Sequence, residues 1–224
     1  LFTKVLDLHL IGTYHFDLNG SARLKNALEN IKPDLILVEG SKTKDQCKED
    51  YSQFLKQKLY EYGITGKLMT AVMEKQERVG YEHKVAKKYA LDHQIRFNYL
   101  NDPLPIPSIK ELKKEAKEEV LDMIKNHVTL EKFIEKLYTR QIEINEWWSY
   151  LKPIIGTEQE KMYAQADIEY NNNSKNLGSR DLIMEKTLRN FLDNSEKIAT
   201  ITGCSHILND PQNINYLPIY NTMK

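Results

Sequence analysis

The chain has 224 residues, of which 41% are hydrophobic, and this is enough to bury one sizeable core. Basic and acidic residues number 32 each, so the formal net charge is zero and no overall basic field attracts nucleic acid. No apolar run reaches the roughly 18 residues of a membrane span, and the first residues lack the layout of a signal peptide. We therefore expect one soluble domain over residues 1–224, with no nucleic acid partner and no membrane span.

The cysteine content favours a reducing compartment. Cys47 and Cys204 are too few for a disulfide framework, so we expect a cytoplasmic protein. The chain begins at Leu1 rather than methionine, and this expectation leaves room for a leader in the natural precursor. Cys204 lies two residues before His206, but two such side chains at a turn point in different directions, which disfavours a Cys/His nucleophile.

The first part of the chain alternates strands with a helix. Residues 4–12 are rich in apolar and β-compatible residues and predict a strand that stops at Gly12; His9 within it is interpreted as a structural residue. A helix opened by Ser21 follows, and then a continuous apolar run at 35–38. Continuous apolar strands are covered on both faces, as in parallel sheets, so these elements predict a βαβ unit with a right-handed crossover.

Helical patterns dominate the middle of the chain. Residues 45–91 are helical with breaks near Gly63 and Gly80, and they lead to a short strand at 95–100. After a stiff proline connector, residues 108–172 predict a large, charged helical insertion, either a bundle beside the sheet or a cover over its edge.

The last elements complete the predicted fold. The pattern predicts a helix at 180–192, a strand at 197–202 and, from a weaker apolar run at 216–220, an edge strand. We expect an α/β fold with a mainly parallel sheet flanked by helices. Trp147 and Trp148 cannot both face one core, so either one is exposed at the site or at a contact in a homo-oligomer, or the two lie on opposite sides of a buried helix.

Each of the four clear predicted strands, leaving out the weaker run at 216–220, is followed within about three residues by a side chain that can bind a metal or transfer a proton: His15, Glu39, Asp102 and His206. The carboxyl ends of parallel strands form the ligand-binding edge of open α/β sheets, so these four residues should meet there. His15 and His206 share the spacing Gly-x-x-His, in which the glycine permits a sharp turn that directs the imidazole over the end of the sheet.

These segments also carry a resemblance to a known family. Five segments resemble the TraB/PrgY/GumN family in content and order. They are Leu-Ile-Gly-Thr-Tyr-His ending at His15, Lys-Pro-Asp-Leu-Ile-Leu-Val-Glu ending at Glu39, Gly-Tyr-Glu ending at Glu82, Ser-Arg-Asp ending at Asp181 and Ile-Thr-Gly-Cys-Ser-His ending at His206. The wider superfamily includes erythromycin esterases, ChaN-type haem-binding lipoproteins and the metal-dependent Tiki proteases. The match spans nearly the whole chain.

The chain departs from the family at the third strand. The usual Asp-Arg-Pro is replaced by Asn101-Asp102-Pro103, so the arginine that would support an anion-binding loop is missing. The carboxy-terminal membrane segments of some relatives are also absent from these residues, and no membrane role is carried over.

Two histidines and a carboxylate suit a divalent first-row metal such as manganese, cobalt, zinc or iron. His15, Glu39 and His206 are the candidate ligands, and the alternative for each histidine is a polar residue that satisfies loop backbone. Such a metal activates a bound water, and the resemblance makes Glu82 the candidate base.

Arg180 and Asp102 are the remaining site candidates. Arg180 opens a helix, where its charge opposes the helix dipole, so it is expected to pair with a carboxylate at the strand ends or to grip the substrate. Asp102, at the end of the third strand, is a second candidate for contact with the substrate. The remaining helical histidines, at positions 83, 93 and 127, are expected on the surface.

Two functions follow from the resemblance. The first is a metal-dependent hydrolase of a peptide, amide or ester bond, acting on a small-molecule or peptide substrate. The second is a non-catalytic module that binds a peptide signal or a cofactor such as haem. A structural protein that uses the helical segment is a third reading, which leaves the polar strand ends unexplained.

Overall fold

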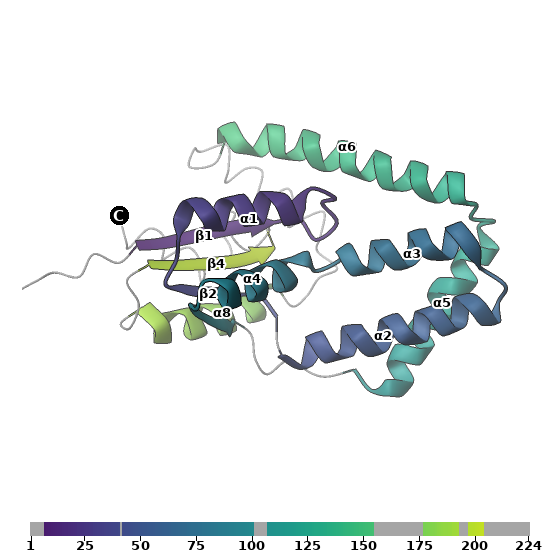
Figure 1. Cartoon of the computed structure of the whole chain (residues 1–224), viewed down its shortest axis with the longest axis horizontal. Helices are drawn as coiled ribbons and strands as arrows, with labels where there is room; N and C mark the ends of the chain where they lie inside the picture. Colours follow the sequence, from purple (N-terminus) through teal and green to yellow (C-terminus); the bar gives the residue numbers. More distant parts are fainter. Residues whose placement is uncertain (1–6, 41, 101–106, 155–176, 193–196, 204–224) are drawn as a thin grey trace, which may run out of the picture.

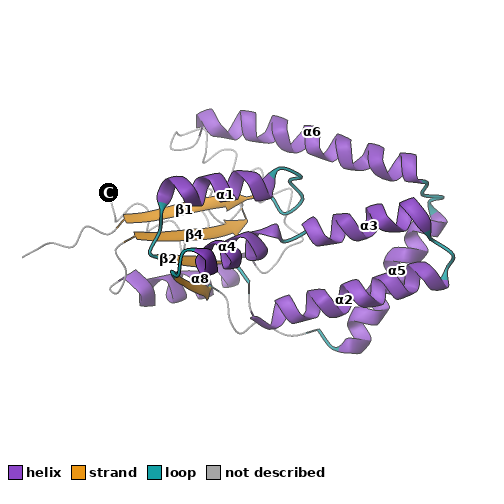
Figure 2. Ribbon diagram, viewed as in Figure 1, coloured by secondary structure: helices purple, strands orange, loops and turns teal. Residues whose placement is uncertain are grey.

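The computed structural model of the chain describes residues 7–40, 42–100, 107–154, 177–192 and 197–203. In this part of the chain, four parallel strands form one sheet in the order β1-β4-β2-β3 (Figure 1). The strands are β1 (Asp7–Thr13), β2 (Leu35–Val38), β3 (Arg96–Tyr99) and β4 (Lys197–Gly203). Helices flank this sheet (Figure 2), so the α/β fold predicted from the sequence is confirmed.

The strand predictions agree closely with the structure. The strands predicted at 35–38, 95–100 and 197–202 occur with ends that move by one residue at most. β1 continues one residue past Gly12, because Thr13 still pairs with Gly203 of β4. β4 lies between β1 and β2 in the sheet. The two strands of the predicted βαβ unit, β1 and β2, are therefore not direct neighbours. Residues 4–6 and 216–220 lie outside the described residues.

The apolar strand β2 explains how helices cover both faces of the sheet. Successive strand side chains point to opposite faces. Ile36 and Val38 accordingly pack with α1 (Gly20–Ile31) and α4 (Tyr81–Asp92). Leu35 and Leu37 pack on the opposite face with Met184 and Leu188 of α8 (Leu177–Leu192). The uninterrupted apolar run of β2 therefore reflects burial of this strand on both faces of the sheet, as predicted.

A group of helices extends from one end of the sheet (Figure 1). α2 (Lys42–Glu61), α3 (Gly66–Arg78) and α5 (Ile109–Lys125) share a second hydrophobic core, made of Leu55, Leu59, Val72, Ala116, Val120 and Met123. With α6 (Leu130–Ile154) we call these helices the helical arm. α5 and α6 lie in the predicted insertion 108–172, whose residues 155–172 are outside the described ranges. The arm also includes α2 and α3, which the sequence did not assign to it.

Helix ends in this region follow their local sequence. Gly63 (φ +75°) and Gly80 (φ +71°) adopt left-handed backbone at the two predicted breaks. Ser108 and Glu111 form a capping box at the start of α5, where each side chain satisfies a backbone N–H. Within the described ranges, no helix combines the length and apolar character needed to cross a bilayer.

Candidate functional site

The carboxyl ends of the four strands lie at one edge of the sheet. Thr13 at the end of β1 pairs with Gly203 at the end of β4. Val38 at the end of β2 pairs with Ile201 of β4 and with Tyr99 of β3. Gly12 and Gly203, the first residues of the two Gly-x-x-His segments, therefore lie at the ends of neighbouring parallel strands, one residue apart in register. Ligands of open α/β sheets bind at this edge, which gives the predicted convergence a structural basis.

His15 lies in the loop after β1 and contacts the first turn of α4. Its Nδ1 is 2.7 Å from Oε1 of Glu82. The hydroxyl of Thr13 lies 3.0 Å from the same Oε1 and 2.9 Å from the carbonyl oxygen of Thr202. The side chain of His15 is 52% exposed and that of Glu82 only 4%. A carboxylate that accepts the Nδ1 hydrogen fixes the ring and leaves Nε2 for a metal or a proton, as in metal-binding histidines.

The environment of Glu82 keeps its carboxylate ionised. Burial raises the pKa of Glu82, but the hydrogen bond and positive charge of His15, the backbone N–H of Glu82 itself and the hydroxyl of Thr13 outweigh this effect. The net pKa lies below its ordinary value. Oε2 of Glu82 is buried without a hydrogen-bond partner among the described residues. Glu82 is thus an acceptor at neutral pH with one oxygen committed to His15 and one that still needs a donor.

Glu39 joins the end of β2 to the end of β4. It is buried, its backbone N–H donates to the carbonyl oxygen of Ile201 at 2.8 Å, and its Oε2 accepts the N–H of Gly203 at 2.7 Å. Glu39 therefore fixes the first residue of the second Gly-x-x-His segment. This contact holds the strand end from which the segment leads toward His206.

A cavity of about 170 Å³ opens at this edge of the sheet. The structure brings three of the predicted site residues to its walls, namely His15, Glu39 and Glu82. Lys48 of α2 and His83 of α4 also line it, and the sequence analysis had given neither of them a place at the site. The cavity therefore combines carboxylates, imidazoles and an ammonium group from elements that are far apart along the chain.

His83 contradicts the expectation that it lies on the surface. It is 7% exposed, its ring lies 5.5 Å from that of Tyr99, and Gly40 makes room for it. A Cβ at position 40 would lie 2.6 Å from Nε2 of His83. The charged sequence of α4 gave no sign of this burial, because the space comes from a glycine in another element. His93 and His127 are exposed, as predicted.

A wider groove adjoins the cavity. The groove has a volume of about 450 Å³ and runs between α2, the end of α3 and α4. Lys48, Val79, Gly80 and His83 line both spaces, so the two adjoin. Gly80 is required here for two reasons: its φ is +71°, and a Cβ would collide with the ammonium group of Lys48. Gly80 and Lys48 are therefore in contact where the cavity and the groove adjoin.

The other predicted site residues fall outside what the structure describes. His206, Asp102 and Cys204 lie outside the described residues, as do the side chains of Trp147 and Trp148. The backbone of Arg180 belongs to α8, but this helix begins at Leu177, three residues earlier than predicted, so Arg180 does not open it; its side chain is not among those described. The roles proposed for these residues stay predictions.

The donor types at the cavity fit a divalent first-row metal. His15 supplies an imidazole and Glu39 a carboxylate, two of the three predicted ligands. The buried, unpartnered Oε2 of Glu82 is an atom that a bound cation or its water would satisfy. In the described ranges, no group of three or more His, Cys, Asp or Glu side chains is close enough to hold a metal ion, and the third predicted ligand, His206, is beyond these ranges.

No family model, no curated protein and no solved structure matches the chain.

Proposed function

We propose that the chain is a metal-dependent hydrolase of the TraB/PrgY/GumN type, which cleaves a peptide, amide or ester bond at the carboxyl ends of its strands. The observation that carries the proposal is the pair of His15 and Glu82 at the wall of a cavity that also includes Glu39. His15, Glu39 and His206 would hold the metal, with His206 three residues after Gly203. A metal in such a site lowers the pKa of a bound water and polarises the bond under attack.

The residues of the chain have distinct tasks in this proposal. Oε1 of Glu82 holds Nδ1 of His15, so the ring keeps one orientation while Nε2 serves the cavity. Oε2 of Glu82 takes the proton from the attacking water, since the lowered pKa keeps this carboxylate ionised. His83 lines the same cavity, and we assign to it the transfer of a proton to the leaving group.

The sizes of the two spaces favour hydrolysis over capture of a large cofactor. Pockets that enclose drug-sized ligands measure about 300–1,000 Å³. The cavity, at about 170 Å³, suits a reacting group and a water rather than a haem. The groove, at about 450 Å³, suits the rest of an extended substrate. We therefore place the scissile bond in the cavity and the adjoining part of the substrate beside Lys48.

Two substitutions of Glu82 test the proposal. Glu82→Gln retains an oxygen that can accept from Nδ1 of His15 but removes the base. We expect this variant to bind Mn²⁺ within about threefold of the wild type and to lose turnover about 100-fold or more on a peptide or ester library. Glu82→Ala removes both functions and should weaken Mn²⁺ binding as well. Full turnover by Glu82→Gln would show that Glu82 is not the base.

A further inference from the structure

The loop that carries His15 lies between two helices. We call residues 14–19, which connect β1 to α1, the His15 loop. On one side α4 contacts it: Glu82 accepts from His15, and the hydroxyl of Tyr81 hydrogen-bonds the backbone of Tyr14. The ring of Tyr81 occupies the space that a side chain at Gly20 would need. One face of the loop is thus fixed by the helix that also supplies Glu82.

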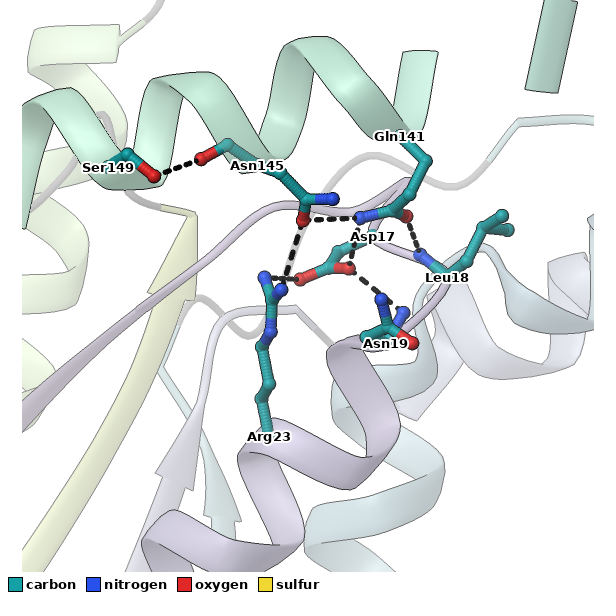
Figure 3. A network of polar contacts seen from close by, with 7 residues as sticks. All are labelled: Asp17, Leu18, Asn19, Arg23, Gln141, Asn145 and Ser149. Atoms are coloured by element: carbon teal, nitrogen blue, oxygen red, sulfur yellow. Dashed lines mark hydrogen bonds and ion pairs between the residues drawn. The ribbon is translucent and has the colours of Figure 1, made fainter. Parts of the chain in front are cut away.

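On the other side the loop is held by α6 of the helical arm (Figure 3). Gln141 is 8% exposed, and its Oε1 accepts the N–H of Leu18 at 2.6 Å. Its Nε2 donates to Oδ1 of Asp17 at 3.1 Å. The buried side-chain amide of Gln141 therefore hydrogen-bonds both the backbone and a side chain of the His15 loop. Both contacts lie within three residues of His15.

Asp17, the side chain that Gln141 contacts, also has other hydrogen-bond partners. The carboxylate of Asp17 is buried and also accepts from Arg23 of α1 at 2.7 Å and from the N–H of Asn19 at 2.9 Å. Oδ1 of Asn145, one turn after Gln141, accepts from Nε2 of Gln141 and from Arg23. Asp17, Arg23, Gln141 and Asn145 therefore form one connected polar network that joins the loop to α1 and α6.

A further contact lies next to His15 itself. Arg140 donates to the hydroxyl of Tyr14 at 2.5 Å, and its guanidinium lies 5.4 Å from the centre of the Tyr14 ring. Tyr14 is also the residue whose backbone contacts Tyr81. Consecutive residues of α6, Arg140 and Gln141, thus contact the loop on either side of His15.

We propose that Gln141 is a positioning residue for His15. By holding Asp17 and Leu18 it keeps the His15 loop against α4, where Nδ1 meets Glu82 and Nε2 serves the cavity. The helical arm is in this way part of the site, although none of α6 lines the cavity in the described residues. The role in metal binding rests on the proposed function, whereas the orientation of the His15 ring does not.

The test compares Gln141→Leu with Thr139→Ala. Thr139 is exposed on the same helix and has no contact with the loop among the described residues, so it controls for changes in α6. Two quantities are measured on the full chain: the Kd for Mn²⁺, and in metal-free protein the ¹⁵N chemical shifts of the His15 imidazole, which show which ring nitrogen carries hydrogen. A purely structural role of Gln141 would lower the melting temperature without changing the His15 shifts.

We expect Gln141→Leu to raise the Kd for Mn²⁺ about tenfold and to shift the His15 ¹⁵N signals toward mixed protonation, with Thr139→Ala unchanged in both. If the wild type binds no Mn²⁺, the proposed function fails, and the ¹⁵N signals alone decide the positioning role. Unchanged His15 signals in Gln141→Leu overturn it. If Gln141→Leu does not fold, Gln141→Asn, whose shorter side chain cannot reach both partners, is measured against the same criteria.

Discussion

Nδ1 of His15 lies 2.7 Å from Oε1 of Glu82, although 67 residues separate the two along the chain. The contact joins the loop after β1 to α4, which packs on the same face of the sheet as α1. It makes Glu82 more than a nearby base, because the carboxylate also fixes the ring that it faces. Contacts from more than one element therefore set the orientation of the His15 ring, and substitutions in each of these elements can change it.

The first prediction concerns metal affinity. Glu82→Ala should weaken binding of Mn²⁺ about 10- to 100-fold, because the imidazole of His15 loses the acceptor that fixes it. Glu74→Ala, an exposed glutamate of α3, provides the matched control and should leave the affinity unchanged. Isothermal titration with Mn²⁺ measures both. Equal affinities of the two variants would show that the contact between His15 and Glu82 does not support the metal site.

The second prediction concerns the pH dependence of stability. The pKa of Glu82 is lower in the folded protein than its ordinary value of 4.5, because the contacts of His15, the backbone and Thr13 outweigh the raising effect of burial. A group with a lowered folded pKa stabilises the fold above its unfolded pKa and loses that contribution as pH falls through the folded pKa. The wild type should therefore lose stability more steeply below pH 4.5 than Glu82→Gln does.

Urea unfolding of metal-free protein between about pH 7 and pH 3 measures this difference. Well above pH 4.5 the two curves should run parallel, since Glu82 is then ionised in both the folded and the unfolded wild type. Parallel curves over the whole range would contradict the assigned ionisation of Glu82.

The third prediction concerns Gly40. Its φ is +136°, and a Cβ there would lie 2.6 Å from Nε2 of His83. Gly40→Ala should therefore lower the free energy of unfolding by about 3 kcal/mol, through backbone strain and overpacking together. Gly63→Ala is the control, because Gly63 has φ +75° and a Cβ there would meet no atom within 4 Å. This substitution adds backbone strain alone and should cost about 1 kcal/mol. Equal losses in chemical denaturation would mean that His83 does not occupy this space.

The fourth prediction separates the chemistry of His83 from its packing. His83→Phe keeps an aromatic ring against Tyr99 and Gly40 but removes both ring nitrogens. Turnover should fall about 100-fold if the imidazole protonates the leaving group, and the melting temperature measures any separate change in packing. His93→Phe, on the exposed end of the same helix, should retain activity. Activity retained by His83→Phe would limit His83 to a packing role.

The parts of the fold that local sequence could predict share a simple physical basis. The run 35–38 predicted a strand buried on both faces, because strands of a parallel sheet that is covered on both sides read as continuous apolar runs. Gly63 and Gly80 predicted the helix breaks, because both positions require left-handed backbone. Polar residues at strand ends predicted the edge at which the cavity occurs, because parallel strands end together.

The residues that the sequence did not assign to the site depend on contacts between distant segments. His83 sits in a charged helix, and its burial arises from the missing Cβ of Gly40, 43 positions earlier by the numbering. Lys48 reaches the cavity because Gly80 lets its ammonium group approach the backbone. Gln141 reads as one polar residue among many on α6, and only its partners Asp17 and Leu18 show its position.

The most direct test of the proposed metal site is the metal content of gently purified protein, measured by elemental mass spectrometry. Wild type is compared with the double variant His15→Ala, His206→Ala and with His127→Asn, which alters an exposed histidine whose φ of +48° suits asparagine. We predict near-stoichiometric manganese, cobalt, zinc or iron in the wild type and in His127→Asn, and its loss in the double variant. A wild type that holds no metal, even after incubation with these ions, would contradict the proposal.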